Sequence, residues 1–480
     1  MATFYVANFG CRATQADGAA IERQFRERGL EQAHAPNEAE IVVLNTCTVT
    51  AAADQDARAA VRRMHRKNPA AQIVVTGCYA QRAPEEVAAL PGVKTVIGNS
   101  HKHRLAEIAL ASPIASTSVV TGVPAHQTTE LDDASSTAFF PLSTLIRPNQ
   151  QPATNNQPLI FVSDIFAHTE LQAAPVFDAA NERTRPNLKV QDGCDNRCSF
   201  CVIPYVRGQS RSLKLEEVIR EVDVLVTAGY REVVISGINL GRWGRDLPNG
   251  QRPGFEDLVR AILSETKLEK LRISSVEPMD WTDELIHLVA TSPRVAKHAH
   301  VPMQSGSDAV LRRMHRKYRS WHYREKIEKI RAHMPSVAIG ADVMVGFPGE
   351  TEREFEETRR MVEELPFTYL HVFTYSRRPG TSAAAMSNQI PVPVARERSR
   401  ILREIAAAKK LDFIRRFAGQ TIEAITLNVS GNDSSGEYTE ALTDNYLPLR
   451  LKGCHAPNRW ARARIEQVKD ETLIGALIKS

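Results

Sequence analysis

Six of the seven cysteines form two groups of three, which constrains the fold because each group must converge in space if it binds a metal cluster. The second group, Cys194, Cys198 and Cys201, lies in one short segment, GCDNRCSFC. A structural zinc site takes four protein ligands, whereas three thiolates on a [4Fe-4S] cluster leave one iron open to bind and reductively cleave a substrate. The C-x3-C-x2-C spacing therefore predicts a [4Fe-4S] cluster with an open iron. A zinc knuckle completed by a distant histidine is the alternative.

The cysteines of the first group are far apart in the sequence, but each follows a predicted strand. Cys11 follows TFYVANFG, Cys47 follows IVVLNT and Cys78 follows IVVTG. Loops after the carboxyl ends of parallel strands converge on one edge of the sheet, so these three thiols can meet there. They predict a second cluster with three ligands and one open iron. The alternative is three unrelated thiols, because free cysteine is often just a small core residue.

Longer segments resemble one known family, the methylthiotransferases, which are radical S-adenosylmethionine enzymes with an auxiliary [4Fe-4S] cluster in an N-terminal domain. The resemblance spans nearly the whole chain and rests on NTCTVT, TGCYAQ, GCDNRCSFCVIPYVRGQSRS, SSVEP, VPMQSGSD and DVMVGFPGET. Because NTCTVT precedes the polar, basic segment ADQDARAAVRRMHRKNP, the chain most resembles the branch acting on threonylcarbamoyladenosine in transfer RNA. After Cys11 the family usually has Lys and then Asn, where this chain has Arg12 and Thr14.

This resemblance implies a tRNA methylthiotransferase that inserts sulfur and then methyl at C2 of an N6-threonylcarbamoylated adenosine beside the anticodon. It implies that the cluster on Cys194, Cys198 and Cys201 reduces S-adenosylmethionine to give a 5′-deoxyadenosyl radical. The cluster on Cys11, Cys47 and Cys78 would present the sulfur, and a second S-adenosylmethionine would supply the methyl group. The implied partners are the tRNA anticodon arm, an electron donor such as a flavodoxin or ferredoxin, and a sulfur donor.

Three other functions stay open at this point. Two lie within the family: the isopentenyladenosine tRNA enzyme and the enzyme that modifies an aspartate of a ribosomal protein. The third is a non-catalytic iron–sulfur protein that binds RNA. Cleavage of S-adenosylmethionine on reduction would separate an enzyme from a binder.

Periodicity predicts an α/β chain of three units. Residues 1–112 alternate strand and helix as a small doubly wound α/β domain. Residues 113–180 lose periodicity and predict a flexible insertion or linker. Residues 181–418 repeat strand and helix about six times, which predicts a (βα)6 partial barrel like that of radical S-adenosylmethionine enzymes. Residues 419–480 predict a small antiparallel β-barrel that resembles the RNA-binding TRAM domain.

Candidate cofactor-binding residues follow successive predicted strands of the central unit, where the active sites of such barrels lie. Phe200 precedes the third cysteine of its loop, where the family usually has a ring that shields the cluster and cofactor from water. The others are Ser236, Gly237, Asn239, Ser275, Glu277, Gln304 and Asp342. Gly237 can instead be a turn glycine, and Glu277 and Asp342 can be structural salt-bridge partners.

Two basic stretches are candidate phosphate-contact surfaces, although the formal net charge is only +5. Residues 311–333 carry nine Lys or Arg against two Glu, and residues 396–417 carry eight against three acidic residues. The predicted RNA contacts are Arg312, Arg313, Arg316, Arg377 and Arg378. Solvated helix faces are the alternative for both stretches. The predicted TRAM unit is locally near neutral, with seven basic and eight acidic residues, and Cys454 within it is an incidental thiol.

We expect a cytoplasmic protein without a membrane partner. No run approaches about 18 apolar residues, and MATFYVANFGC has no basic region followed by an apolar stretch. Cytosolic thiols are kept reduced, so clustered cysteines there favour metal ligation over disulfides.

Overall fold

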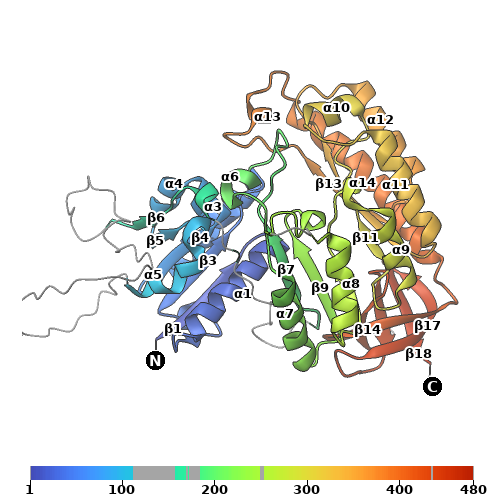
Figure 1. The fold of residues 1–480 in the computed structure, drawn as a ribbon, viewed down its shortest axis with the longest axis horizontal. Coiled ribbons are helices and arrows are strands. Elements are labelled where there is room, and N and C mark those ends of the chain that lie inside the picture. The colour runs from blue at the N-terminus through green and yellow to red at the C-terminus, as the bar shows by residue number, and fades with distance from the viewer. Residues whose placement is uncertain are drawn as a thin grey trace, which may run out of the picture.

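In the computed structural model, which describes residues 2–111, 157–168, 171, 184–248, 253–433 and 436–478, the chain is an α/β protein with three units. The N-terminal unit lies beside the central unit, and a small β-barrel lies below the central unit at the C-terminus (Figure 1). The predicted fold class is thereby confirmed. No helix in the described part of the chain combines the length and apolarity that a membrane span needs.

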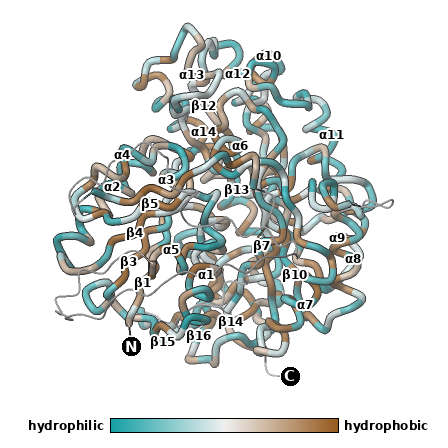
Figure 2. The backbone as a smooth tube through the Cα atoms, turned by 60° about the vertical axis from the view of Figure 1, so that its left-hand side comes forward, coloured by the Kyte–Doolittle hydropathy of each residue, from teal (hydrophilic) through white to brown (hydrophobic). Residues whose placement is uncertain are grey.

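The N-terminal unit is a parallel sheet of six strands in the order β2-β1-β3-β4-β5-β6. Its strands are β1 (Thr3–Asn8), β2 (Glu31–Gln32), β3 (Ile41–Thr46), β4 (Gln72–Gly77), β5 (Val93–Ile97) and β6 (Leu159–Phe161). Its helices are α1 (Arg12–Arg26), α2 (Ala51–Lys67), α3 (Cys78–Arg82), α4 (Pro84–Ala88) and α5 (Leu105–Ala111), with 3-10 turns η1 (Pro36–Glu38) and η2 (Asn99–Arg104). Every residue of β3 and β4 is buried, as expected for parallel strands covered on both faces. Figure 2 shows brown, hydrophobic segments along the strands of this sheet.

Most of the stretch that the sequence predicts to be a flexible insertion, residues 113–180, lies outside the described residues. Its described part corrects that prediction locally, because β6 pairs with β5 and extends the first sheet. The following turn η4 (Ile165–Ala167) buries Ile165. Three residues are too few to show a period, so the sequence pattern could not reveal this strand.

The central unit is an arc of six parallel strands, which confirms the predicted partial barrel. They are β7 (Asn187–Asp192), β9 (Glu232–Gly237), β10 (Lys270–Ile273), β11 (His298–His300), β12 (Ala338–Val345) and β13 (Tyr369–Thr374). Parallel bridges from Leu271 to Val295 and from Ser275 to His300 join the first three strands to the last three. The short strand β8 (Arg211–Ser212) pairs antiparallel with β7 at the edge.

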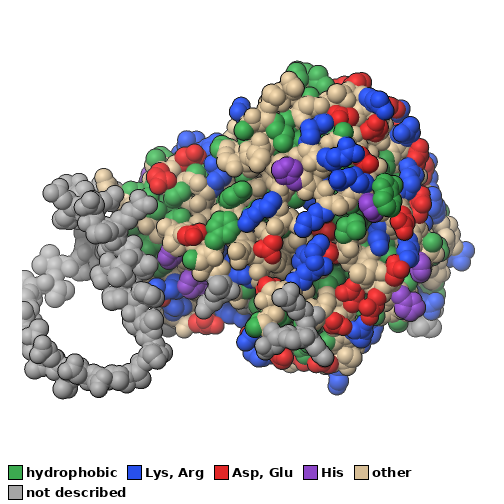
Figure 3. Space-filling model, turned by 45° about the horizontal axis from the view of Figure 1, so that its top comes forward, with side chains coloured by type: hydrophobic (Ala, Val, Ile, Leu, Met, Phe, Trp, Pro, Cys, Tyr) green, Lys and Arg blue, Asp and Glu red, His purple; other side chains and the backbone are tan. Residues whose placement is uncertain are grey.

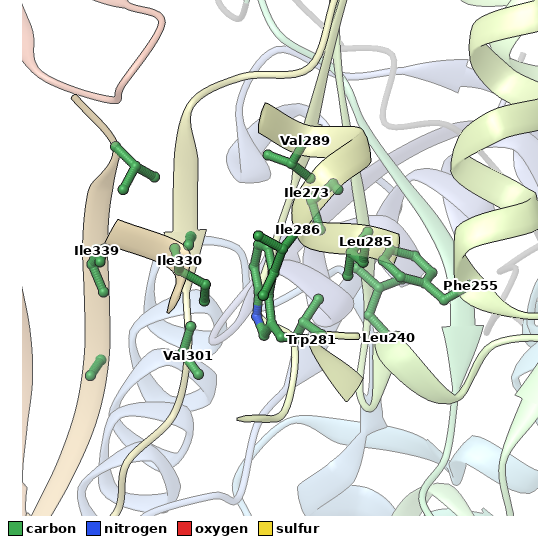
Figure 4. Close-up of a cluster of buried hydrophobic side chains, with 14 of the residues drawn as sticks. Leu240, Phe255, Ile273, Trp281, Leu285, Ile286, Val289, Val301, Ile330 and Ile339 are labelled. Carbon is green, nitrogen blue, oxygen red and sulfur yellow. The ribbon is translucent and has the colours of Figure 1, made fainter. Parts of the chain in front are cut away.

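Helices cover the outer face of this arc and enclose a large apolar core, part of which Figure 4 shows around Trp281, Leu285 and Ile339. The helices of the whole central unit, not all of which lie on this face, are α6 (Ile203–Arg207), α7 (Leu215–Thr227), α8 (Phe255–Glu265), α9 (Asp283–Thr291), α10 (Asp308–Arg313), α11 (Ser320–His333), α12 (Glu352–Glu364), α13 (Ser382–Ala385) and α14 (Val392–Arg415), with 3-10 turns η5 (Leu240–Arg242) and η6 (Pro278–Asp280). Alternate strand residues such as Ala299, Ala341 and Val372 belong to this core. Their neighbours His300, Asp342 and His371 therefore face the lumen of the arc.

The C-terminal unit is a closed barrel in the order β14-β15-β16-β18-β17, in which β16 and β18 are parallel and the other paired strands are antiparallel. Its strands are β14 (Thr421–Asp433), β15 (Gly436–Thr443), β16 (Pro448–Lys452), β17 (Trp460–Lys469) and β18 (Thr472–Leu477). Lys270, at the start of β10, pairs with Asp444 at 2.9 Å, and Ala338, at the start of β12, is buried in the barrel's core. The barrel therefore covers the amino ends of the central strands, and their carboxyl ends point away from it.

Candidate active site

The loop after β7 carries Cys194, Cys198 and Cys201 at the carboxyl end of the arc. It is closed by backbone hydrogen bonds from Cys194 N to Gly208 O at 3.1 Å and from Cys201 N to Cys198 O at 3.1 Å. All three cysteines are partly exposed. Burial raises the pKa of the Cys194 thiol to about 11 and that of Cys201 to about 12. Deprotonating these thiols therefore needs compensating positive charge, such as iron ions supply.

Two polar side chains already donate hydrogen bonds to sulfurs of this loop. Asn239 Nδ2 lies 3.7 Å from Cys194 Sγ, and Arg316 Nη1 lies 3.3 Å from Cys198 Sγ. Donors of this kind favour thiolate sulfur and tune a bound cluster. This donor set fits a [4Fe-4S] cluster on the three cysteines.

Arg316 corrects a prediction, because the sequence placed it on an RNA-binding surface. Its side chain is only 6% exposed and also forms an ion pair with Glu277. A guanidinium held between a carboxylate and a thiol sulfur cannot reach a phosphate of an RNA bound at the surface. The basic run around it gave no local sign that this arginine points inward.

Three buried polar atoms at this end of the arc make no hydrogen bond within the described residues. They are Ser236 Oγ, Asn239 Oδ1 and Gln304 Oε1. An unpaired buried polar group costs about 1–3 kcal/mol, so such groups near a cluster loop suit a polar ligand that supplies the partners. Gln304 also has a φ of 62°, a strained conformation for a residue with a side chain.

The other predicted cofactor residues lie around the same end of the arc. Phe200 packs edge-on against Phe347, with ring centroids 6.4 Å apart, and Ser275 bridges to His300. Gly237 packs on Gln191, so that an added Cβ would lie 2.9 Å from its Oε1. Asp342 lies next to Gln304, because its backbone O accepts from Gln304 N at 2.8 Å, and its Oδ1 lies 3.4 Å from His300 Nε2 on the lumen wall.

The structure also brings the first cysteine group together. Cys11, Cys47 and Cys78 follow β1, β3 and β4, which are neighbours in the sheet. A hydrogen bond with Cys47 lowers the pKa of Cys11, and the same bond together with burial raises the pKa of Cys47. Gly10 permits this approach, because an added Cβ would lie 2.4 Å from Cys47 Cβ.

Further polar side chains surround this group. Thr14, where the resembled family usually has Asn, is buried with its Oγ1 3.6 Å from Cys11 Sγ. Asn99 Nδ2 lies 3.6 Å from Cys78 Sγ and donates to Val206 O at 2.6 Å. Since Val206 belongs to α6, directly after the second cysteine group, Asn99 links the surroundings of the two groups.

A buried ion network joins the two units between the cysteine groups. Asp17 from α1 pairs with Arg207 from α6 at 2.9 Å, with Lys102 at 3.0 Å and with Lys189. Burial opposes its ionisation, but these three cations outweigh burial and hold the pKa of Asp17 below its usual range. Arg207 also pairs with Asp192 at 2.9 Å. Sequence reasoning missed this network, because its partners lie up to 190 positions apart.

A second buried ion network also joins the N-terminal unit to the central unit. It consists of Asp54, Thr48, Arg82 and Arg378, and we call it the Asp54 clasp. Asp54 in α2 accepts hydrogen bonds from Arg378 at 2.6 Å, from Arg82 at 3.0 Å and from Thr48 at 2.5 Å. Thr48 directly follows Cys47, and Arg82 ends the helix that Cys78 begins. Arg378, from the loop after β13, is 3% exposed, so the prediction that it contacts RNA is also wrong. Its guanidinium is enclosed between the two units.

The remaining predicted RNA contacts differ in their exposure and in whether they are already paired with a carboxylate. Arg312 and Arg377 are exposed, whereas Arg313 pairs with Glu354 at 2.8 Å. In α14, Arg398 pairs with Glu350 at 2.7 Å, and Arg400 pairs with Glu397 and Glu404. Figure 3 shows Lys and Arg interspersed with Asp and Glu over the right-hand part of its face rather than gathered in one basic patch.

Two family models match separate stretches of the chain. Residues 3–98 match the uncharacterized protein family UPF0004, and residues 188–362 match the radical SAM superfamily. The chain is 34% identical to the threonylcarbamoyladenosine tRNA methylthiotransferase MtaB of Bacillus subtilis, over 94% of this chain and 91% of that protein. It is 32% identical to MtaB of Aquifex aeolicus, over 95% and 98%.

A protein of another tRNA-modifying branch and a solved structure are similar as well. The chain is 32% identical to the tRNA-2-methylthio-N(6)-dimethylallyladenosine synthase of Novosphingobium aromaticivorans, over 88% of this chain and 86% of that protein. Among solved structures, the radical S-adenosylmethionine methyltransferase TsrM of Kitasatospora setae superposes with a TM-score of 0.54 at 15% identity, over 80% of this chain and 75% of that one. At that identity the likeness concerns the fold alone.

Proposed function

The chain belongs to the methylthiotransferase family of radical S-adenosylmethionine enzymes, and we propose that it methylthiolates C2 of N6-threonylcarbamoyladenosine beside the anticodon of a tRNA. The observation that carries this proposal is the pair of three-cysteine groups at the facing strand ends of two units, with Asn99 and Arg207 between them. The substrate is taken from the MtaB proteins of Bacillus subtilis and Aquifex aeolicus, which align with 94% and 95% of this chain.

Each cysteine group would hold one [4Fe-4S] cluster in this proposal. Cys194, Cys198 and Cys201 would bind the cluster at which S-adenosylmethionine is reductively cleaved to a radical that can attack an aromatic C–H position. Cys11, Cys47 and Cys78 would bind the auxiliary cluster that holds the sulfur. Three thiolates on each leave one iron open, and the hydrogen bonds from Asn239 and Arg316 support the first assignment.

The chain's own residues would orient the cofactor and exclude water. Ser236, Asn239 and Gln304 present buried polar atoms without partners, which suits the polar groups of S-adenosylmethionine. Gly237 would let its backbone approach the cofactor, and Ser275 and Glu277 would line the same end of the arc. The ring of Phe200 would keep water away.

The three units would divide the work between them. Residues 1–112 would hold the auxiliary cluster, residues 181–418 would carry the radical chemistry, and residues 419–480 would act as an RNA-binding TRAM domain. The exposed Arg312 and Arg377 remain the proposed phosphate contacts. An electron donor such as a flavodoxin or ferredoxin and a sulfur donor complete the proposed partners.

Nucleoside mass spectrometry of tRNA from a deletion strain tests this function. The expected result is loss of the 2-methylthio group from threonylcarbamoyladenosine and its return on complementation, with methylthiolated isopentenyladenosine unchanged. Loss of the isopentenyl product instead would transfer the proposal to the other tRNA branch. Normal levels of both nucleosides would refute a role in either tRNA modification.

A further inference from the structure

We propose that His300, Asp342 and His371 form a binding site for one divalent transition-metal ion in the lumen of the central arc, separate from the two cysteine groups. One possible ligand atom from each residue lies within 4.8 Å of the others. The three residues come from the adjacent strands β11, β12 and β13. Side chains on neighbouring strands of a packed sheet are held in a defined arrangement, as a metal site requires.

The strand register explains why these side chains meet. Asp342 on β12 is paired directly with His371 on β13, and His300 on β11 is paired with Gly340, two residues before Asp342. Residues 340 and 342 lie on the same face of β12, so the three side chains project from one face. The intervening residues Ala299 and Ala341 are buried in the outer apolar core.

His300 supplies an independent observation. The residue is only 9% exposed, and its Nε2 is buried and has no hydrogen-bond partner among the residues that the structure describes. The 3.4 Å between Nε2 and Asp342 Oδ1 is longer than a usual hydrogen bond of 2.7–3.2 Å. Two ligand atoms about 2.0–2.1 Å from a tetrahedral zinc ion lie about 3.3 Å apart. The separation therefore suits two ligands of one cation better than a donor and its acceptor.

The aromatic rings of Tyr369, His298 and Tyr446 close the site on the side of the C-terminal barrel. Tyr369 lies over Gly340, where an added Cβ would be 2.1 Å from its ring. Its hydroxyl lies 2.7 Å from His298 Nε2, and the His298 ring packs against Tyr446 of the C-terminal barrel at 4.9 Å. The opposite side is open, because Asp342 is 26% exposed and His371 is exposed.

The ligand set defines the class of metal. Two imidazoles and one carboxylate suit zinc, iron(II) and similar first-row ions, and three protein ligands leave at least one coordination position open. That position faces the lumen, where it can take an oxygen or nitrogen donor. His371 has to approach the other two ligands, which its exposed position on β13 permits.

Zinc is the probe for the test, with the full chain first reconstituted with iron and sulfide without oxygen so that the cysteines are occupied. The expected result is about one zinc per chain with unchanged iron, and X-ray absorption showing only nitrogen and oxygen ligands at about 2.0–2.1 Å. His371→Ala and Asp342→Asn should each weaken zinc binding at least tenfold. The matched control is His333→Ala, because His333 is exposed and its ring nitrogen Nδ1 lies 2.9 Å from Lys329 O in its own helix.

Three outcomes would overturn this site. They are the absence of stoichiometric zinc, sulfur at about 2.3 Å in the zinc shell, or zinc binding that survives both ligand substitutions. Thermal unfolding of each variant separates loss of the metal from loss of the fold. The test uses neither tRNA nor turnover, so the site can fail while the proposed function stands, and the reverse also holds.

Discussion

Breaking the Asp54 clasp should loosen the N-terminal unit from the central unit, by an amount that depends on which partner is removed. Asp54→Asn leaves Arg378 without a carboxylate, because Asp54 is its one ion-pair partner among the described residues. Removing one partner of a buried ion pair costs about 3–5 kcal/mol. The same substitution affects Arg82 less, because Arg82 keeps an ion pair at 3.7 Å with Glu86, whose side chain is largely exposed. We therefore expect Asp54→Asn to cost about 3–5 kcal/mol.

Arg378→Gln should cost less than Asp54→Asn. Asp54 would keep Arg82 at 3.0 Å and Thr48 at 2.5 Å, so only the charged hydrogen bonds of Arg378 are lost. A hydrogen bond to a charged group contributes about 1.5–3 kcal/mol. The matched control is Arg377→Gln, because Arg377 is the exposed neighbour and its guanidinium donates a hydrogen bond to the Ala384 carbonyl at 2.9 Å. This control should stay within about 0.5 kcal/mol of the wild type.

Hydrogen exchange of the reconstituted protein measures this loosening as faster local opening in β3, α2 and residues 375–381. A cost of 3–5 kcal/mol corresponds to roughly a hundredfold to several thousandfold faster exchange. The double variant should show a coupling energy of about 0.5–3 kcal/mol between Asp54 and Arg378. Equal exchange in Asp54→Asn and Arg377→Gln, or additive effects in the double variant, would refute the clasp.

Four further predictions concern the clusters and the RNA. The reconstituted chain should bind about eight iron atoms, and replacing either cysteine group with Ala should halve that number; zinc in place of iron, or loss of both clusters together, would contradict it. Cys47→Ala should still cleave S-adenosylmethionine yet form no methylthio product, whereas Cys198→Ala should abolish cleavage; normal thiolation by Cys47→Ala would exclude the auxiliary role. Arg316→Gln should shift the reduction potential of the cluster on Cys194, Cys198 and Cys201 and leave the salt dependence of tRNA binding unchanged. Arg312→Gln should lower the slope of the logarithm of tRNA affinity against the logarithm of salt concentration by about one and leave that potential unchanged. The reverse pattern would identify Arg316 as an RNA contact. Deleting residues 419–480 should lower the thermal stability of the central unit, because Lys270 loses Asp444 and Ala338 loses its covering core; an unchanged melting temperature would show that the barrel is only tethered.

Local pattern was sufficient to predict much of the fold and the cysteine groups. Strands such as Ile41–Thr46 are continuous apolar runs, and each cysteine stands beside a strand end, so topology alone brings Cys11, Cys47 and Cys78 to one edge. The inward turn of Arg316 could not be predicted, because in the sequence it resembles the exposed Arg312 four positions earlier. Its burial depends on Glu277 and Cys198, which are distant in the chain and reach it only in the folded arc.

The two buried ion networks share one arrangement: an aspartate of the N-terminal unit, in the helix after a cysteine, pairs with an arginine of the central unit. Asp17 stands in the helix after Cys11, and Asp54 stands in the helix after Cys47. Each carboxylate accepts an arginine from the central unit, Arg207 and Arg378 respectively. Burying an ion pair contributes little net stability, but it strongly penalises any arrangement in which one partner is left alone. Two such pairs at separate points oppose both sliding and rotation of the N-terminal unit, so the cysteine groups keep one relative position, as the proposed transfer of sulfur to a radical site would require.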